Sequence, residues 1–195
     1  MLSTHISHQI YAKLSFDATF NQKKIIEKLS DWLSQEEHSQ IFLLNGYAGT
    51  GKTTIIAALV GALKELGIKT ILLAPTGRAA KVLARYSHSD ALTIHKRIYR
   101  ERTITDYESK FSLDYNKERG ALFIVDEASM LSSSSSADDA AFGSGNLLDD
   151  LVQYVRSGKQ CRLMLVGDDA QLPPVGADYS PALDPASLLP YGDVE

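Results

Sequence analysis

Residues 41–54 read IFLLNGYAGTGKTT, and this stretch decides the fold. The apolar run Ile41–Leu44 has the length of a buried strand and ends in a turn-forming pair, asparagine and glycine. A helical pattern follows from about residue 52 to residue 66 and is closed by Gly67. The glycines between strand and helix allow consecutive backbone N–H groups to converge on an anion at the helix N-terminus. We therefore predict a strand–loop–helix unit that binds phosphate.

The loop matches the P-loop pattern G-x-x-x-x-G-K-[ST] at every fixed position. Lys52 is expected to reach the β- and γ-phosphates of a nucleotide, and the Thr53 hydroxyl to ligate Mg²⁺. The alternative is a glycine-rich turn that binds nothing, and the strand and helix on either side argue against it. The residues expected to contact ATP here are Gly46, Gly49, Thr50, Gly51, Lys52, Thr53 and Thr54.

Two later apolar runs end in polar residues with suitable chemistry. A strand over Ala121–Val125 would deliver Asp126 at its carboxyl end, where the carboxylate can hold Mg²⁺ through water. Glu127 is placed to polarise the attacking water as a general base. Adjacent acids after a strand are otherwise common as solvated turn residues, and the P-loop favours the functional interpretation. The run Arg162–Val166 leads to Gln171, an amide suited to sensing a γ-phosphate, or simply part of a loop stiffened by two prolines.

Strands alternate with helices along the chain, which predicts an α/β fold with a mostly parallel sheet and helices on both faces. Further helices are predicted over 22–33 and 78–86, and a further strand over 70–74. Thr19 followed by Gln22 predicts a capping box at the start of the first of these helices.

Two segments break this alternation. Residues 132–145 contain a run of serines followed by alanine, aspartate and glycine, which predicts a flexible loop. Residues 103–115 show a rough polar/apolar alternation, which predicts a short hairpin standing off the main sheet.

Composition and charge bound the remaining possibilities. The 195 residues are 44% hydrophobic and 23% charged, which is typical of a globular protein, and no apolar run approaches the roughly 18 residues of a membrane helix. Residues 1–20 show no secretory signal. The single cysteine, Cys161, excludes an internal disulfide and favours the cytoplasm. Net charge is −4, which gives no reason to expect a polyanion as partner.

The charge is unevenly distributed, however. Residues 78–102 are strongly basic, and the only acidic residues among them are Asp90 and Glu101. This excess of positive charge predicts a local track for nucleic-acid phosphates rather than a merely solvated helix face. Its basic residues are Arg78, Lys81, Arg85, Lys96, Arg97, Arg100 and Arg102.

Three stretches resemble motifs Ia, II and III of superfamily 1B DNA helicases of the RecD/TraI/Dda type, also described as the exonuclease V alpha-subunit type. They are APTGRAAK at 74–81, DEASM at 126–130 and GDDAQLPP at 167–174. The resemblance spans roughly Thr19 to Val175. It implies a RecA-like P-loop NTPase domain over 1–176 that uses ATP and Mg²⁺, with a small hairpin insertion at about 100–119.

The resemblance also implies roles for individual residues. Gln22 matches the glutamine that reads the adenine edge, in addition to its capping role. The catalytic set would be Lys52, Thr53, Asp126, Glu127 and Gln171. The residues that would contact single-stranded DNA are Pro75, Thr76, Arg78, Thr93 and His95, although a lone histidine is more often structural. In relatives the hairpin acts as a strand-separating pin, so Tyr107 or Phe111 would stack on a base; the alternative is packing on the hairpin's own base.

The function implied is that of a DNA helicase motor, which couples ATP hydrolysis to 5′→3′ movement along single-stranded DNA and to unwinding at duplex junctions. The family's motor contains a second RecA-like domain, and nothing after Val175 resembles it. We therefore expect residues 177–195 to be a linker-like tail toward that second domain, and this chain to bind ATP–Mg²⁺, hydrolyse it slowly and unwind nothing. Two alternatives are a P-loop kinase of nucleotides or small molecules and a nucleotide-gated DNA-binding module without turnover.

Overall fold

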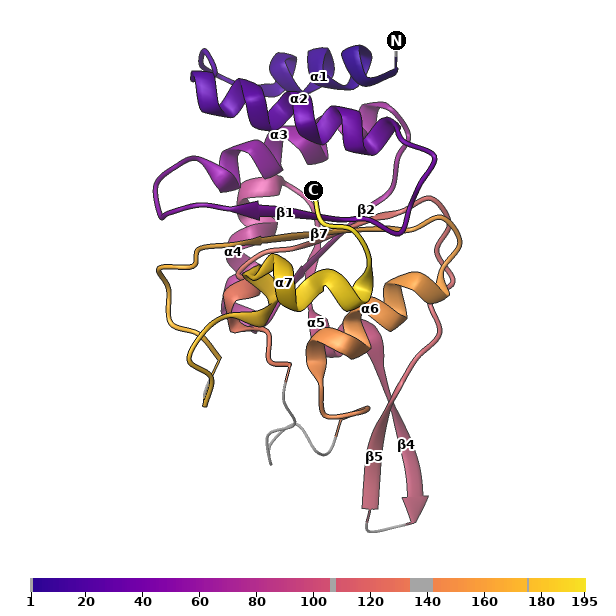
Figure 1. Ribbon diagram of the computed structural model, residues 1–195. Coiled ribbons are helices and arrows are strands. Elements are labelled where there is room, and N and C mark those ends of the chain that lie inside the picture. The colour runs from indigo at the N-terminus through magenta and orange to yellow at the C-terminus, as the bar shows by residue number, and fades with distance from the viewer. Residues whose placement is uncertain (1, 106–107, 134–141, 175) are drawn as a thin grey trace.

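The computed structural model describes residues 2–105, 108–133, 142–174 and 176–195. Within them the main sheet contains five strands in the order β1-β7-β6-β2-β3, and each neighbouring pair is parallel. Figure 1 shows these strands crossing the middle of the molecule. The strands are β1 (Ile41–Asn45), β2 (Thr70–Ala74), β3 (Ala91–Thr93), β6 (Leu122–Val125) and β7 (Arg162–Gly167).

Helices cover both faces of this sheet (Figure 1). One face carries α1 (Leu2–Lys13), α2 (Phe20–Ser34), α3 (Lys52–Glu65) and α4 (Gly77–Ser87). The other face carries α5 (Ile94–Ile98), α6 (Leu147–Ser157) and α7 (Pro185–Leu188), with short 3-10 turns at Ala128–Met130, Pro181–Leu183 and Leu189–Tyr191. The predicted fold class is confirmed. Among the described helices, none has the length and apolar character needed to cross a bilayer.

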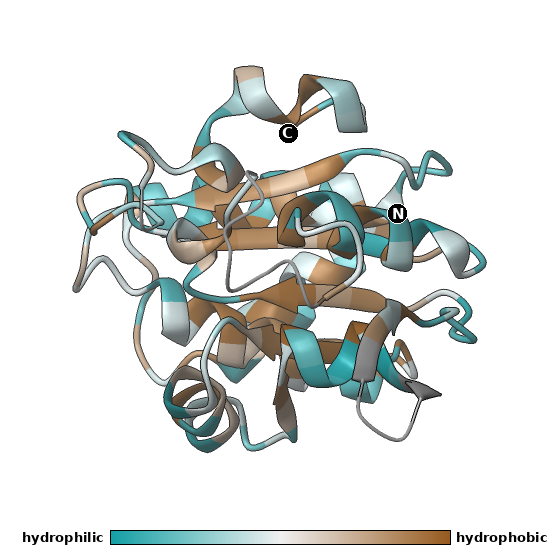
Figure 2. Ribbon diagram, turned by 90° about the horizontal axis from the view of Figure 1, so that it is seen from below, coloured by the Kyte–Doolittle hydropathy of each residue, from teal (hydrophilic) through white to brown (hydrophobic). Residues whose placement is uncertain are grey.

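The continuous apolar runs of the strands follow from this two-sided cover. In β6, Leu122 and Ile124 join the core beneath α1–α4, whereas Phe123 and Val125 join the core beneath α5–α7. Successive side chains of a strand point to opposite faces, so a sheet buried on both sides needs an apolar residue at every position. Figure 2, coloured by hydropathy, shows the brown strands lying between helices with teal outer surfaces.

The predicted capping box is present at α2: the Thr19 hydroxyl accepts from the Gln22 backbone, and the Gln22 amide oxygen accepts from the Thr19 backbone. Helices α1 and α6 were not predicted from the sequence. For α6 a signal existed, because Asn146 caps the helix and its apolar residues repeat with helical spacing.

The predicted hairpin is present, at residues 99–113 in place of the predicted 103–115. Strands β4 (Tyr99–Thr105) and β5 (Glu108–Leu113) pair antiparallel, from Tyr99 opposite Leu113 to Thr105 opposite Glu108. Figure 1 shows the hairpin projecting away from the body beyond α5 and α6. It begins directly after α5 because Tyr99 is both the C-cap of that helix and the first residue of β4. In the serine-rich stretch, residues 134–141 lie outside the described residues.

The last residues differ from the linker-like tail that the sequence predicted. Ala182, Leu183 and Leu188 are buried in the core beneath α5–α7. Asp193 and Glu195 then exchange backbone hydrogen bonds of 3.0 Å with β1, at Ile41 and Leu43. Pro181, Pro185 and Pro190 stand in the first or second position of short helices, where a proline is tolerated because no intrahelical N–H is needed. These residues therefore complete the fold.

Candidate nucleotide and DNA site

The loops that follow the parallel strands gather at one edge of the sheet, as expected for carboxyl ends. A pocket of about 570 Å³ opens there between the P-loop and the ends of β6 and β7. It brings together residues that are far apart in the sequence and that were predicted from separate motifs. Its lining consists of Ala48, Gly49, Gly51, Lys52, Thr53, Thr54, Ala57, Tyr86, Asp126, Glu127, Gly167 and Gln171.

The P-loop has the backbone that phosphate binding requires. Gly49 and Gly51 have φ angles of 78° and 93°, a left-handed region that favours glycine. Gly51 is the N-cap of α3 and carries no side chain that could cap it. The first N–H groups of α3 and the positive end of its dipole are therefore directed to the pocket, where an anion can take the place of a side-chain cap.

Lys52 lies across the mouth of this loop. Its ammonium group donates to the backbone carbonyls of Gly46 and Tyr47, the latter at 2.9 Å. The Gly46 N–H in turn donates to the carbonyl of Gly167 at 3.2 Å, which ties the loop to the end of β7. The cation is thus held at the entrance of the pocket by neutral acceptors and has no carboxylate partner among the described ion pairs.

Gln22 connects α2 to the P-loop. Its amide oxygen accepts from the Thr19 backbone at 3.0 Å, and its amide nitrogen lies 3.5 Å from the Thr50 carbonyl. A Cβ atom built on Gly51 would lie 2.6 Å from that nitrogen, so glycine is also needed there for close packing. The capping role of Gln22 is therefore visible, whereas the adenine contact stays a prediction, since Gln22 does not line the pocket.

The two acids lie where β6 ends. The Asp126 N–H donates to the Leu73 carbonyl on β2, and one Asp126 carboxylate oxygen accepts from the Glu127 N–H at 3.0 Å. Burial raises the pKa of Asp126; the neighbouring Glu127 charge adds to this, while the Glu127 N–H and Lys52 oppose it. Glu127 has a φ of 55°, which is unusual for a residue with a side chain and concentrates backbone strain beside the pocket.

The pocket suits Mg²⁺ bound together with a nucleotide. Within the described part of the chain, no group of three or more His, Cys, Asp or Glu residues is arranged to hold a metal ion. Mg²⁺ bound with a nucleotide does not need one, because it keeps several waters and takes one or two protein oxygens plus phosphate oxygens. Thr53 and Asp126 line the same pocket and supply a hydroxyl and a carboxylate of the required kind.

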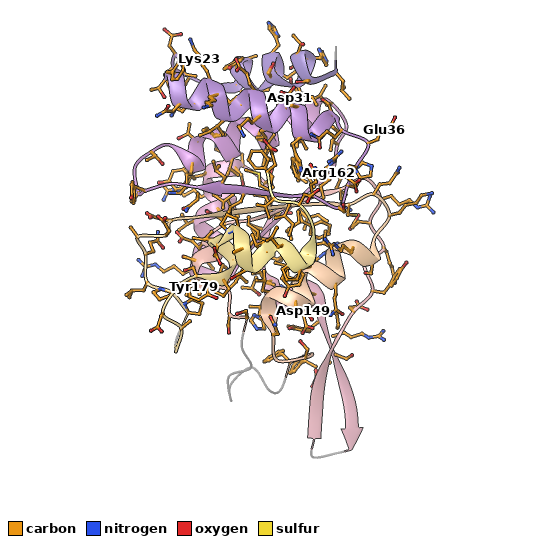
Figure 3. The ribbon with its side chains drawn as sticks, in the orientation of Figure 1. Lys23, Asp31, Glu36, Asp149, Arg162 and Tyr179 are labelled. Carbon is orange, nitrogen blue, oxygen red and sulfur yellow. The ribbon has the colours of Figure 1, made fainter. Side chains whose placement is uncertain are left out.

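Gln171 reaches the pocket from a folded loop after β7. The buried Asp168 organises this loop: its carboxylate accepts from the Ala170 N–H at 3.0 Å, and its carbonyl accepts from the Gln171 N–H at 3.1 Å. Gln171 also lines a neighbouring cavity of about 640 Å³, together with Tyr179, which Figure 3 labels. The amide therefore lies between the nucleotide pocket and this second cavity.

The predicted DNA contacts lie along the same edge of the sheet. Thr76 caps α4 and Thr93 caps α5, with side-chain oxygens that accept from Ala79 and Lys96. The strands before them pair so that Ala74 lies opposite Thr93. Pro75 and Thr76 are half-buried and Arg78 is exposed at the start of α4. The structure thus brings these two turns together at the carboxyl edge of the sheet.

Two other predicted contacts have a different environment. The His95 ring packs edge-on against Phe142, with centroids 5.0 Å apart, and tilted against Tyr99 at 5.6 Å. Phe111 stacks on Phe142 at 4.5 Å. The observed contacts therefore fit the alternatives given above, a structural role for His95 and packing at the hairpin base for Phe111. Tyr107 lies outside the described residues.

Tyr86 was missed by sequence reasoning. It stands near the end of α4, is 59% exposed, and lines the nucleotide pocket beside Thr54 and Ala57 of α3. No local pattern could have identified it, because its place depends on α4 lying against α3.

Figure 3 shows Arg162 at the opposite end of the sheet, where its guanidinium lies over the Trp32 ring at 5.2 Å and donates to the Glu37 carbonyl.

The sequence matches the AAA domain family over residues 21–180. The chain is 32% identical over 156 residues to the ATP-dependent RecD2 DNA helicase of Deinococcus radiodurans, covering 80% of this chain and 19% of that protein. It is 30% identical over 182 residues to the ATP-dependent DNA helicase dda of Enterobacteria phage T4, covering 90% of this chain and 36% of that protein. An uncharacterized protein of Methanocaldococcus jannaschii is 35% identical over 154 residues, covering 71% of this chain and 12% of that protein.

The chain thus spans well under half the length of these relatives. The family match includes the P-loop, the acid pair and Gln171, all of which face one pocket in the structure. The parallel sheet with helices on both faces is the architecture that the motif resemblance implied. The chain therefore belongs to the AAA domain family, as a RecA-like domain of the superfamily 1B RecD/Dda type.

Proposed function

We propose that this chain binds ATP with Mg²⁺ and is a motor domain that couples ATP hydrolysis to movement along single-stranded DNA. The observation that carries the proposal is the convergence of Lys52, Thr53, Asp126, Glu127 and Gln171 on one pocket at the N-terminus of α3. A glycine-rich turn without a ligand would not gather these groups from three separate loops.

Each residue has a distinct task in this proposal. The N–H groups of the P-loop and the Lys52 ammonium bind the phosphates and offset their charge. Thr53 and Asp126 would hold Mg²⁺, which would supply positive charge against the phosphate oxygens. Glu127 accepts the proton of the attacking water. The Gln171 amide N–H donates to an oxygen of the terminal phosphate, and its loop responds when that phosphate leaves.

The DNA partner is proposed from the turns at the ends of β2 and β3. Pro75, Thr76 and Thr93 lie at the same edge of the sheet as the nucleotide pocket, and Arg78 at the start of α4 adds an exposed cation. A phosphate chain laid across these helix starts would meet N–H groups and positive charge. The proposed polarity, 5′→3′, follows from the resemblance alone.

Full activity is proposed to need a second motor domain, which in this family places arginines against the γ-phosphate. An arginine supplied across an interface is worth about 10³–10⁵ in rate. We therefore expect ATP binding and slow hydrolysis from this chain, and no strand separation. The single cysteine, Cys161, is buried and unpaired, which fits the cytoplasm as the proposed compartment.

The test measures the affinity of a fluorescent ATP analogue in the presence of Mg²⁺, together with ATP hydrolysis with and without single-stranded DNA. Lys52→Ala should weaken nucleotide binding about 10- to 100-fold, because charge-assisted hydrogen bonds to the phosphates are lost. Lys64→Ala is the matched control, since Lys64 lies in the last turn of the same helix and is exposed. Unchanged affinity in Lys52→Ala would refute the proposed site. Phosphate transfer to a nucleoside monophosphate would favour a kinase instead.

A further inference from the structure

The serine-rich stretch ends in a segment that is hydrogen-bonded to the hairpin and to α6. We call residues 142–146 the anchor segment. Phe142 forms a parallel bridge with Phe111 of β5, and the Gly143 N–H donates to the Phe111 carbonyl at 2.9 Å. Asn146, at the other end, caps α6 by accepting from the Asp149 N–H at 3.0 Å. The anchor segment therefore joins the base of the hairpin to the start of α6.

Aromatic rings fill the space between the anchor segment, the hairpin and α5. The ring cluster consists of His95, Tyr99, Phe111 and Phe142. Phe142 is its centre: it lies 4.5 Å from the Phe111 ring, 5.0 Å from His95 and 5.5 Å from Tyr99. Each contact is of a stacked, tilted or edge-on kind that adds attraction to the burial of apolar area. Three elements thus meet at a single side chain.

A buried carboxylate reinforces the cluster. Asp150 in the first turn of α6 is 3% exposed, and one of its oxygens accepts from the Tyr99 hydroxyl at 2.7 Å and from the Ser144 N–H at 3.0 Å. A Cβ atom on Gly143 would lie 2.0 Å from that oxygen and 2.6 Å from the Tyr99 ring, and Gly143 has a φ of 49°. The absence of a side chain at Gly143 therefore allows the segment to lie close to the Tyr99 ring.

The hairpin needs such support. A two-stranded ribbon is marginally stable on its own in water, and this one projects from the body of the molecule (Figure 1). At its base β4 continues directly from α5, and the Asp114 N–H donates to the Ile98 carbonyl at 2.7 Å. The anchor segment adds a third backbone connection, and its Phe142 ring covers the base of β5.

We propose that Phe142 is a positioning residue: it holds the hairpin at a set orientation relative to α5, whose N-cap Thr93 belongs to the proposed DNA track. The inference rests on the proposed function, because the orientation matters only if DNA meets both elements. Single-stranded DNA lies along the helix starts, whereas a strand junction must also reach the hairpin. Loss of Phe142 should therefore weaken junction binding and spare single-strand binding.

The experiment compares the wild-type chain with Phe142→Ala, and with Phe142→Tyr as the conservative rescue. Amide hydrogen exchange in β4 and β5 should accelerate about tenfold or more in Phe142→Ala. This acceleration corresponds to the loss of one or two aromatic ring pairs. Exchange in β1, β6 and β7 should stay unchanged. Affinity for forked DNA should fall by a similar factor, with affinities for single-stranded DNA and for ATP unchanged. Phe16→Ala, which removes an aromatic residue that is 45% exposed outside the ring cluster, should leave all of these values at the wild-type level.

The remaining outcomes separate the two proposals. Unchanged hairpin exchange in Phe142→Ala, or faster exchange with wild-type affinity for forked DNA, overturns the positioning role. Faster exchange throughout the sheet together with loss of ATP binding also overturns it, since Phe142 would then only stabilise the fold. A wild-type chain that binds neither DNA form refutes the DNA partner itself, and that result is visible without any variant.

Discussion

Two glycines of the P-loop, Gly49 and Gly51, are needed beside the pocket for different reasons. Gly49 and Gly51 both have positive φ angles, yet their surroundings differ. No atom lies within 4 Å of a Cβ built on Gly49, whereas a Cβ on Gly51 would lie 2.6 Å from the Gln22 amide nitrogen. The first glycine is needed for its backbone conformation alone, and the second is also needed for the close approach of α2.

This difference predicts unequal effects on stability. Gly49→Ala should lower the free energy of unfolding by about 1–2 kcal/mol, the cost of a left-handed alanine. Gly51→Ala should cost about 1 kcal/mol more, because the Gln22 amide must move and its bond to the Thr19 N–H is lost. Chemical denaturation measures both.

The matched background is Gln22→Ala, in which the extra cost of Gly51→Ala should disappear. Equal costs for the two glycine variants in the wild-type background would contradict the proposed contact.

At the scale of an element, the start of α4 combines a cap with a proposed DNA contact. The Thr76 side chain accepts from the Ala79 N–H at 3.2 Å, which satisfies one N–H at the helix N-terminus. The same turn follows β2 at the sheet edge that carries the nucleotide pocket. A substitution that keeps the cap but changes the charge can therefore separate the two roles.

We expect Thr76→Asp to leave the free energy of unfolding within about 0.5 kcal/mol of wild type, since aspartate caps helices as well as threonine does. Its affinity for single-stranded DNA should fall about tenfold or more, because like charges about 4 Å apart repel by about 1–4 kcal/mol at a protein surface. Fluorescence anisotropy with a labelled oligonucleotide measures this. Thr76→Ser is the control and should resemble wild type in both respects. A Thr76→Asp variant that binds DNA normally would leave Thr76 with a capping role only.

For the whole molecule, the last residues close the fold around β1 and β7. Leu183 lies so close to Gly167 that a Cβ there would approach its side chain to 2.7 Å. Leu188 joins the same core, and the backbone of 193–195 pairs with β1 at the edge of the sheet. An edge strand that is paired in this way presents fewer free N–H and C=O groups to other chains.

Two neighbouring leucines test whether this segment belongs to the folded core. Leu188 is 0% exposed and Leu189 is 64% exposed. Leu188→Ala should lower the free energy of unfolding by about 2–5 kcal/mol, as removal of a buried leucine side chain does. Leu189→Ala should change it by about 0.5 kcal/mol or less. Thermal and chemical unfolding provide the measurement, and two neutral variants would instead indicate the linker-like tail that the sequence predicted.

The sequence by itself determined the fold class and predicted the chemistry proposed for the nucleotide site. The run at 41–54, the acid pair after β6 and the loop with Gln171 each contain a local pattern, because a strand, a turn and a helix start depend on neighbours in the chain. The carboxyl ends of parallel strands must meet at one edge, so Lys52, Asp126 and Gln171 could be expected in one pocket. The hairpin was visible for the same local reason.

Other features were decided only by the tertiary structure. Tyr86 lines the pocket because α4 lies beside α3, and His95 and Phe111 face Phe142 because the chain returns to the hairpin base after the serine-rich stretch. The last residues became part of the core because β1 and β7 left an apolar face and an edge to cover. Contacts of this kind join residues distant in the sequence, and their free energy comes from burial and ring packing that no local pattern records.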